Sequence, residues 1–257
     1  MDTTTLTEAL RNLNADALSW KFALYSAHKG RDGIELEWHL CNMQGIPGQV
    51  DLIREHLLKK PVADKPVALY SPFLSDKENI FALENSNDMI HAQLTDIFLN
   101  IQNGQAYPPQ DFASGKLPKI VGYAFYGEQS KDSESKERVL FMRRGNPFLA
   151  GASLFMGAED EIIVNNMPVI KFTTAVDFLS INDSCYIFSS SIENDLSFEN
   201  RYFAIAEKCL EKLAEAEIIG NYDSFENTVM KIKNAKKFLT FNDEIRIILS
   251  DCLLQKG

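Results

Sequence analysis

The sequence predicts an α+β protein with a mixed, largely antiparallel sheet or sheets, helices packed on one side, and a helical C-terminal part. Three observations lead to this class. Apolar and polar residues alternate between residues 20 and 40, short strand-like runs follow closely between residues 120 and 188, and apolar residues recur at helical spacing after residue 195. Strands and helices therefore occupy separate stretches, whereas a βαβ fold would alternate them regularly.

The domain organisation is predicted from the chain length and from the position of a segment that contains proline and glycine. The 257 residues, 45% of them hydrophobic, suffice for one large core or two small ones. Residues 104–118 contain Pro108-Pro109 and two glycines, which is typical of a linker. We therefore expect an N-terminal α+β domain over residues 1–106 and a second α+β domain, with C-terminal helices, over residues 107–257.

The first elements are a short helix and a hairpin. Thr5 and Glu8 have the spacing of a capping box, which predicts a helix to about Leu13. Residues 20–25 and 34–40 alternate in polarity on either side of a glycine-containing turn, which predicts an antiparallel hairpin. The polar face of its second strand, which includes His39, is expected to be solvated.

Three further elements complete the first half. Apolar residues at helical spacing predict a helix over residues 48–60, which Pro61 ends. Residues 67–71 form the next expected strand. Ser86 can then cap a longer helix whose inner face is apolar, with Ile90, Leu94, Ile97, Phe98 and Ile101.

The second half contains strands and then helices. Two expected strands, 120–126 and 138–143, flank a polar, charged loop over residues 127–137. Five short runs separated by turn residues follow, at 153–156, 161–164, 169–172, 176–181 and 185–188. Helical periodicity predicts three final helices, near residues 202–213, 224–239 and 243–254.

Composition restricts the cellular setting. No apolar run approaches the roughly 18–20 residues that a membrane-spanning helix needs, and the N-terminus lacks the features of a signal peptide. The four cysteines are far apart and form no Cys-x-x-Cys pair, which is typical of reduced thiols. We therefore expect a cytoplasmic protein.

Catalytic motifs do not emerge from the sequence. It contains no phosphate-binding P-loop, no Gly-x-Gly-x-x-Gly turn and no Gly-x-Ser-x-Gly elbow, and its four histidines lack metal-ligand spacing. Asp111 and Glu134-Ser135-Lys136 resemble the acidic–acidic–lysine set of magnesium-dependent nucleases, but a flexible-looking loop carries the second part, so a solvated loop is the better interpretation. We expect no enzyme, no metal and no cofactor.

Two basic clusters are the candidate binding residues in a chain of net charge −10. Arg143 and Arg144 end a strand, where a guanidinium can bind phosphate bidentately; the alternative is a solvated strand end or an internal salt bridge. Lys233 and Lys237 share one flank of an expected helix, where the alternative is an ordinary solvated face. Both clusters lie outside residues 158–200, which contain eight acids and one base.

A strand–turn–strand–helix pattern runs through Pro168-Val169-Ile170, Ala175 to Ile181, Asn182-Asp183 and Cys185 to Phe188, and ends with Phe198-Glu199 opening an expected amphipathic helix. Through these motifs, residues 138–215 show a resemblance to the KwaB-like family, the soluble component of the Kiwa anti-phage defence system. The resemblance implies a defence protein that binds phage DNA without catalysis, blocks replication or transcription, and is recruited to the inner membrane by a KwaA-like membrane partner.

The resemblance carries over no DNA-contact residue. Because a net charge of −10 opposes DNA binding, we expect a segregated basic surface assembled across a homodimer. Two alternatives remain: an acidic docking or scaffold protein for a membrane sensor, without DNA binding, and a metal-dependent nuclease.

Overall fold

The computed structural model describes about three fifths of the chain, namely residues 3–29, 34–70, 76–83, 88–104, 119–130, 136–149, 153–156, 162–165, 169–181, 184–193, 195–196, 210–211, 224 and 226. The chain divides into two compact units. The first contains Met1–Tyr70 and Leu74–Ile192, and the second contains Ser71–Phe73 and Glu193–Gly257. The second unit is almost wholly outside the described residues, and with it the three expected C-terminal helices.

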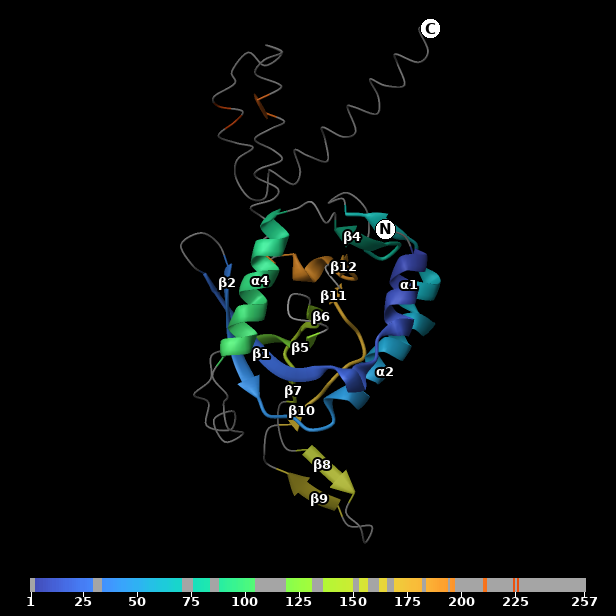
Figure 1. Cartoon of the computed structure of the whole chain (residues 1–257). Coiled ribbons are helices and arrows are strands. Elements are labelled where there is room, and N and C mark those ends of the chain that lie inside the picture. The colour runs from blue at the N-terminus through green and yellow to red at the C-terminus, as the bar shows by residue number, and fades with distance from the viewer. Residues whose placement is uncertain are drawn as a thin grey trace, which may run out of the picture. The chain divides into compact units, whose positions relative to one another are not determined.

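An eight-stranded sheet forms the centre of the first unit (Figure 1). Its order is β2-β1-β5-β6-β11-β12-β4-β3, and every neighbouring pair is antiparallel except β3 and β4. The strands are β1 (Ser19–Lys29), β2 (Ile34–Cys41), β3 (Val67–Leu69), β4 (Ile80–Leu83), β5 (Ile120–Ser130), β6 (Lys136–Arg144), β11 (Phe178–Ile181) and β12 (Ser184–Ile187). The expectation of a mixed, largely antiparallel sheet is confirmed.

Helices cover both faces of this sheet, so the expectation of helices on one side is wrong. On one face, α1 (Thr3–Asn12) and α2 (Ile46–Lys59) join the core cluster that contains Phe22 and Phe125. On the other face, Phe98 of α4 (Asp88–Asn103) stacks on Tyr126, with ring centroids 5.2 Å apart. Figure 1 shows the sheet between α4 and the pair α1 and α2. Both faces of the strands are apolar, because each face meets a helix.

The expected domain boundary at residues 106–107 falls inside the first unit. β1 pairs with β5 from Ser19 opposite Glu128 to Ser26 opposite Ile120, so strands from before and after the boundary share one ladder. Backbone hydrogen bonding between β1 and β5 thus joins the two expected domains into a single sheet. A segment that contains proline and glycine indicates a connection between elements. Whether that connection separates two domains depends on whether strands on its two sides pair with each other.

Two glycines of β5 allow bulky rings of β1 to lie across the sheet. Gly127 is opposite Trp20, and Gly122 is opposite Tyr25. A Cβ atom on Gly122 would lie 2.3 Å from Cζ and Oη of Tyr25, and one on Gly127 would lie 2.8 Å from the Trp20 ring. The absence of a side chain at these positions is therefore required by the packing of both rings.

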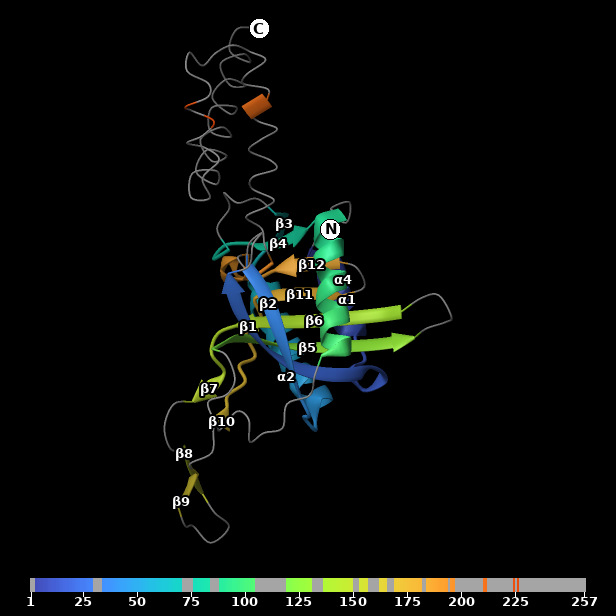
Figure 2. The ribbon, with the colours of Figure 1, turned by 90° about the vertical axis from the view of Figure 1, so that its left-hand side faces the viewer.

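The β5–β6 hairpin is longer than the sequence predicts. Its ladder continues to Ser130 opposite Lys136, so most of the expected loop over residues 127–137 is strand. Polar side chains near a hairpin tip face water on both sides and lose the alternation that reveals a strand. Figure 2 shows β5 and β6 extending together beyond the rest of the sheet.

Smaller elements accompany the sheet. Two short antiparallel pairs join β7 (Phe148–Leu149) to β10 (Val169–Ile170) and β8 (Ser153–Met156) to β9 (Ile162–Asn165). The remaining short elements are η1 (Ala15–Ala17), α3 (Pro61–Asp64) and η2 (Ser190–Ile192). Within the described part of the chain, no helix has the length and apolar character needed to cross a membrane.

Two local predictions are corrected, and one strand was not predicted. Thr5 lies inside α1, which begins at Thr3, so it does not cap the helix. β4 follows no pattern that the sequence analysis identified, because its four residues are buried on both faces. His39 is 1% exposed, not solvated, and its Nε2 lies 3.2 Å from Oγ of Ser26. Alternation of polar and apolar residues predicts a solvent-exposed strand face only where no other element packs on that face.

Candidate functional site

Four strands begin or end at one end of the sheet, and this brings distant residues together. β5 and β11 begin there, while β6 and β12 end there, because antiparallel neighbours run in opposite directions (Figure 2). The registers place Gly122 opposite Arg144 and Phe178 opposite both Met142 and Ile187. Residues just outside the four strands are therefore neighbours in space.

An open depression of about 470 Å³ lies at this end of the sheet. It contains three cationic side chains: both arginines that the sequence predicted, and Lys119, which the sequence analysis missed. Lys119 immediately precedes β5. Its position beside the two arginines could be predicted only if the pairing of β5 with β6 were known. The lining residues are Lys119, Ile120, Val121, Arg143, Arg144, Gly145, Asn146, Ser189 and Ser191. We call this set the basic depression.

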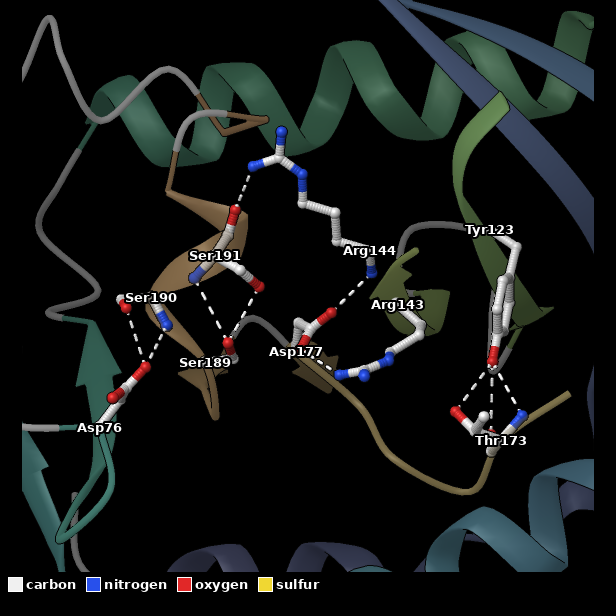
Figure 3. Close-up of polar contacts among 9 residues, drawn as sticks. All are labelled: Asp76, Tyr123, Arg143, Arg144, Thr173, Asp177, Ser189, Ser190 and Ser191. Carbon is white, nitrogen blue, oxygen red and sulfur yellow. Dashed lines mark hydrogen bonds and ion pairs between the residues drawn. The ribbon is translucent and has the colours of Figure 1, made fainter. Parts of the chain in front are cut away.

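Arg143 is held by a buried carboxylate. Its Nη1 donates to Oδ1 of Asp177 at 2.5 Å, and the Asp177 side chain is only 1% exposed. The backbone N–H of Arg144 donates to the other carboxylate oxygen at 2.6 Å. Figure 3 shows Asp177 between the two arginines. The internal salt bridge that was the alternative for this pair is therefore present, and Arg143 remains one-third exposed beside it.

Arg144 takes a different direction, as adjacent strand residues must. Arg143 is opposite Tyr123 and Arg144 is opposite Gly122, so the side chains leave opposite faces (Figure 3). Nη1 of Arg144 donates to the carbonyl oxygen of Ser191 at 2.6 Å. Both residues nonetheless line the basic depression, because they are adjacent at the end of β6.

The electrostatics of Asp177 depend on its donors. Burial raises the pKa of Asp177 above its ordinary value, and this rise is opposed by the Arg144 N–H, by the charge and hydrogen bond of Arg143, and by a hydrogen bond from Ser189. An ionised carboxylate without those donors would be costly in this position. The ion pair thus fixes the guanidinium of Arg143 at the strand end.

Two serines of one turn, Ser189 and Ser191, also line the basic depression. Asp76 accepts hydrogen bonds at Oδ2 from the backbone N–H of Ser190 at 2.7 Å and from its hydroxyl at 2.8 Å. The backbone hydrogen bond from Ser190 is the largest cause that lowers the pKa of Asp76, with Lys65 contributing. Oγ of Ser189 and Oγ of Ser191 lie 2.9 Å apart. The turn is therefore fixed by contacts outside the depression (Figure 3).

A second anchor fixes the segment that leads to Asp177. The Tyr123 hydroxyl accepts a hydrogen bond from the Thr173 N–H at 3.1 Å and lies 3.3 Å from its Oγ1 (Figure 3). The neighbouring Phe172 packs edge-on against Phe22, with centroids 5.1 Å apart. The chain between β10 and β11 is thus tied to the sheet on the approach to the basic depression.

A separate depression of about 500 Å³ lies where β2 ends beside β1. Its lining is mostly apolar and half-buried, with Trp20, Leu40, Cys41 and Met43, and Lys21 donates from there to the Gln102 carbonyl at 2.8 Å. Burial raises the pKa of Cys41 to about 12. A thiol with that pKa is no nucleophile at neutral pH.

Most of the other sequence candidates fall on residues that the structure does not describe. Lys233 and Lys237 lie outside the described residues, as do Asp111 and Glu134 of the nuclease-like set. Of the described cysteines, Cys41 and Cys185, neither forms a disulfide with the other. Among the described side chains, no group of three or more His, Cys, Asp or Glu is placed to hold a metal ion.

Comparison of the chain with protein-family models, with curated proteins and with solved structures finds no match.

Proposed function

We propose that this chain is a KwaB-like anti-phage defence protein that binds duplex DNA without cleaving it and acts with a KwaA-like membrane partner. The observation that carries the DNA-binding part is the basic depression, whose lining includes Lys119, Arg143 and Arg144. The resemblance of residues 138–215 supports the defence setting. Guanidinium and ammonium groups bind phosphate oxygens, and such contacts supply most of the affinity for DNA that is independent of sequence.

The prior fixation of both arginines supports this proposal. Asp177 fixes Arg143, and the Ser191 carbonyl fixes Arg144. Each side chain therefore loses little conformational freedom when a phosphate binds, which lowers the entropic cost of binding. The net charge of −10 confines attraction to such local clusters, and a homodimer would double the number of basic depressions on one assembly.

The test is fluorescence anisotropy of a labelled 30-bp duplex at several salt concentrations. We expect micromolar affinity. The logarithm of the association constant should fall linearly with the logarithm of the salt concentration, with a slope of about −0.9 for each phosphate neutralised. The double substitution Lys119→Gln and Arg144→Gln should reduce the steepness of that salt dependence by the amount expected for about two phosphate contacts. Arg143 is left intact in this variant because its removal would leave the buried carboxylate of Asp177 without its cationic partner.

The matched control is Lys59→Gln with Lys60→Gln, which removes the same charge from exposed positions at the end of α2. An equal loss in both variants would show that only bulk charge matters. Charge reversal of Lys233 and Lys237 in a third variant tests the other cluster. Absence of a mobility shift at ten micromolar protein, together with co-purification of a membrane partner, would favour the scaffold alternative; plasmid cleavage with Mg²⁺ would favour a nuclease.

A further inference from the structure

We propose that the basic depression selects a phosphomonoester dianion, supplied either by a 5′-nucleotide or by the 5′-terminal phosphate of DNA, over the diester phosphates along the duplex. This inference deepens the proposed function and rests on the same site. It is carried by the local charge, by the depth of Arg143 and by the hydroxyl lining.

The local charge matches a dianion. Lys119, Arg143 and Arg144 supply three positive charges, and Asp177 removes one of them. A phosphomonoester carries between one and a half and two negative charges near pH 7, since its second pKa is about 6, whereas a diester phosphate carries one. A terminal phosphate therefore neutralises the depression, and a single diester leaves one cation uncompensated.

The position of Arg143 also favours a phosphate that projects. Two thirds of its side chain is covered, and Asp177 fixes its Nη1 within the sheet end. A terminal phosphate presents three oxygens at the tip of a chain and can enter a recess. A diester phosphate is flanked by sugar on both sides, so it reaches exposed cations more readily than recessed ones.

The remaining lining offers neutral hydrogen-bonding groups. Of the lining residues, Ser189 and Ser191 carry hydroxyls and Asn146 carries a carboxamide. The volume of about 470 Å³ falls within the usual range for sites that bind small molecules. Asp76 fixes the serine turn through Ser190, and Asp177 and the Ser191 carbonyl fix the two arginines, so these parts of the lining are ordered before any ligand binds.

The first experiment compares 5′-dAMP with its 5′-methyl ester, which retains the nucleoside and loses one negative charge, by isothermal titration calorimetry. We expect dAMP to bind at least tenfold more tightly at pH 7.5, and the preference to shrink at pH 5.5 as the dianion is protonated. The Lys119→Gln, Arg144→Gln variant should lose this preference, and the Lys59→Gln, Lys60→Gln control should keep it.

The second experiment compares a 30-bp duplex with 5′-phosphate ends, the same duplex with 5′-hydroxyl ends, and relaxed circular plasmid. Tighter binding to the phosphorylated ends, with competition by dAMP, supports the inference. Equal binding to all three DNAs without competition by dAMP overturns it and leaves the proposed function standing. Binding of dAMP without binding of any DNA supports the site chemistry and overturns the proposed function, and failure of every ligand overturns both.

Discussion

Asp177 and Arg143 form an ion pair of 2.5 Å across a sequence separation of 34 residues, and the carboxylate is buried while the guanidinium is one-third exposed. The pair joins the segment before β11 to the end of β6. It fixes the geometry of the basic depression, and it also contributes to stability, because removing either partner leaves the other without its charge complement.

The substitution Arg143→Ala should lower the free energy of unfolding by about 2–3 kcal/mol, measured by urea denaturation, because the buried carboxylate loses a charged donor. Adding Asp177→Asn to that variant should recover part of the loss, since the amide carries no charge and still accepts from the Arg144 N–H. The control is Lys59→Ala, whose pair with Glu55 is exposed and contributes about 0.5 kcal/mol or less. Equal losses for Arg143→Ala and Lys59→Ala would contradict the structural role.

Stability should depend on pH through His39. Burial lowers the pKa of His39 below 6.5, and Glu37 partly opposes this. The folded state therefore keeps the ring neutral where the unfolded chain binds a proton. Its contribution to stability is complete above about pH 6.5 and is lost as the pH falls toward the folded-state pKa. The urea midpoint should decrease between pH 7.5 and pH 5.5, and His39→Gln should reduce that decrease.

The matched control is His28→Gln in the partner strand of the same hairpin. His28 is about half exposed and lies 3.3 Å from Glu35. This variant should keep the full decrease of the urea midpoint with falling pH. If His28→Gln abolished the decrease and His39→Gln did not, the titrating group would be wrongly assigned.

Gly122→Ala should destabilise the fold by about 1–3 kcal/mol in urea denaturation, because a methyl group there overlaps the Tyr25 ring. Tyr25 is fully buried, so its ring has no room to move aside. Gly48→Ala in α2 is the control, since a Cβ at that position would meet no atom within 4 Å apart from its chain neighbours and the nearby backbone of its own helix. The control should be neutral or stabilising by up to about 1 kcal/mol, as for glycine in a helix. If Gly122→Ala left the free energy of unfolding unchanged, the close approach of the Tyr25 ring to Gly122 would be refuted.

Cys41 should resist alkylation in the folded protein. With its pKa raised to about 12 from 9.0, the thiolate fraction at pH 8 falls by about a thousandfold relative to an unperturbed thiol. Iodoacetamide labelling followed by peptide mass spectrometry measures this residue separately from the other three cysteines. Labelling in 8 M urea should proceed at the rate of a free thiol, and fast labelling of Cys41 without urea would contradict the burial.

The sequence by itself determined the elements whose signal is local. The β1–β2 hairpin, α2, β6 and most of β5 were predicted from periodicity and turn residues, because one polar or apolar face repeats within a short stretch. The same local reading located Arg143 and Arg144 at the end of a strand. It also offered both interpretations of that pair, a phosphate site and an internal salt bridge.

The tertiary structure alone decided what depends on residues distant in sequence. Pairing of β1 with β5 joined the two expected domains, and α4 covered the face that was expected to be open. Burial of His39, the ion pair of Asp177 with Arg143, and the approach of Lys119 to the serine turn all follow from strand order. Strand order is set by contacts between distant segments, and no pattern within a short stretch of sequence encodes it.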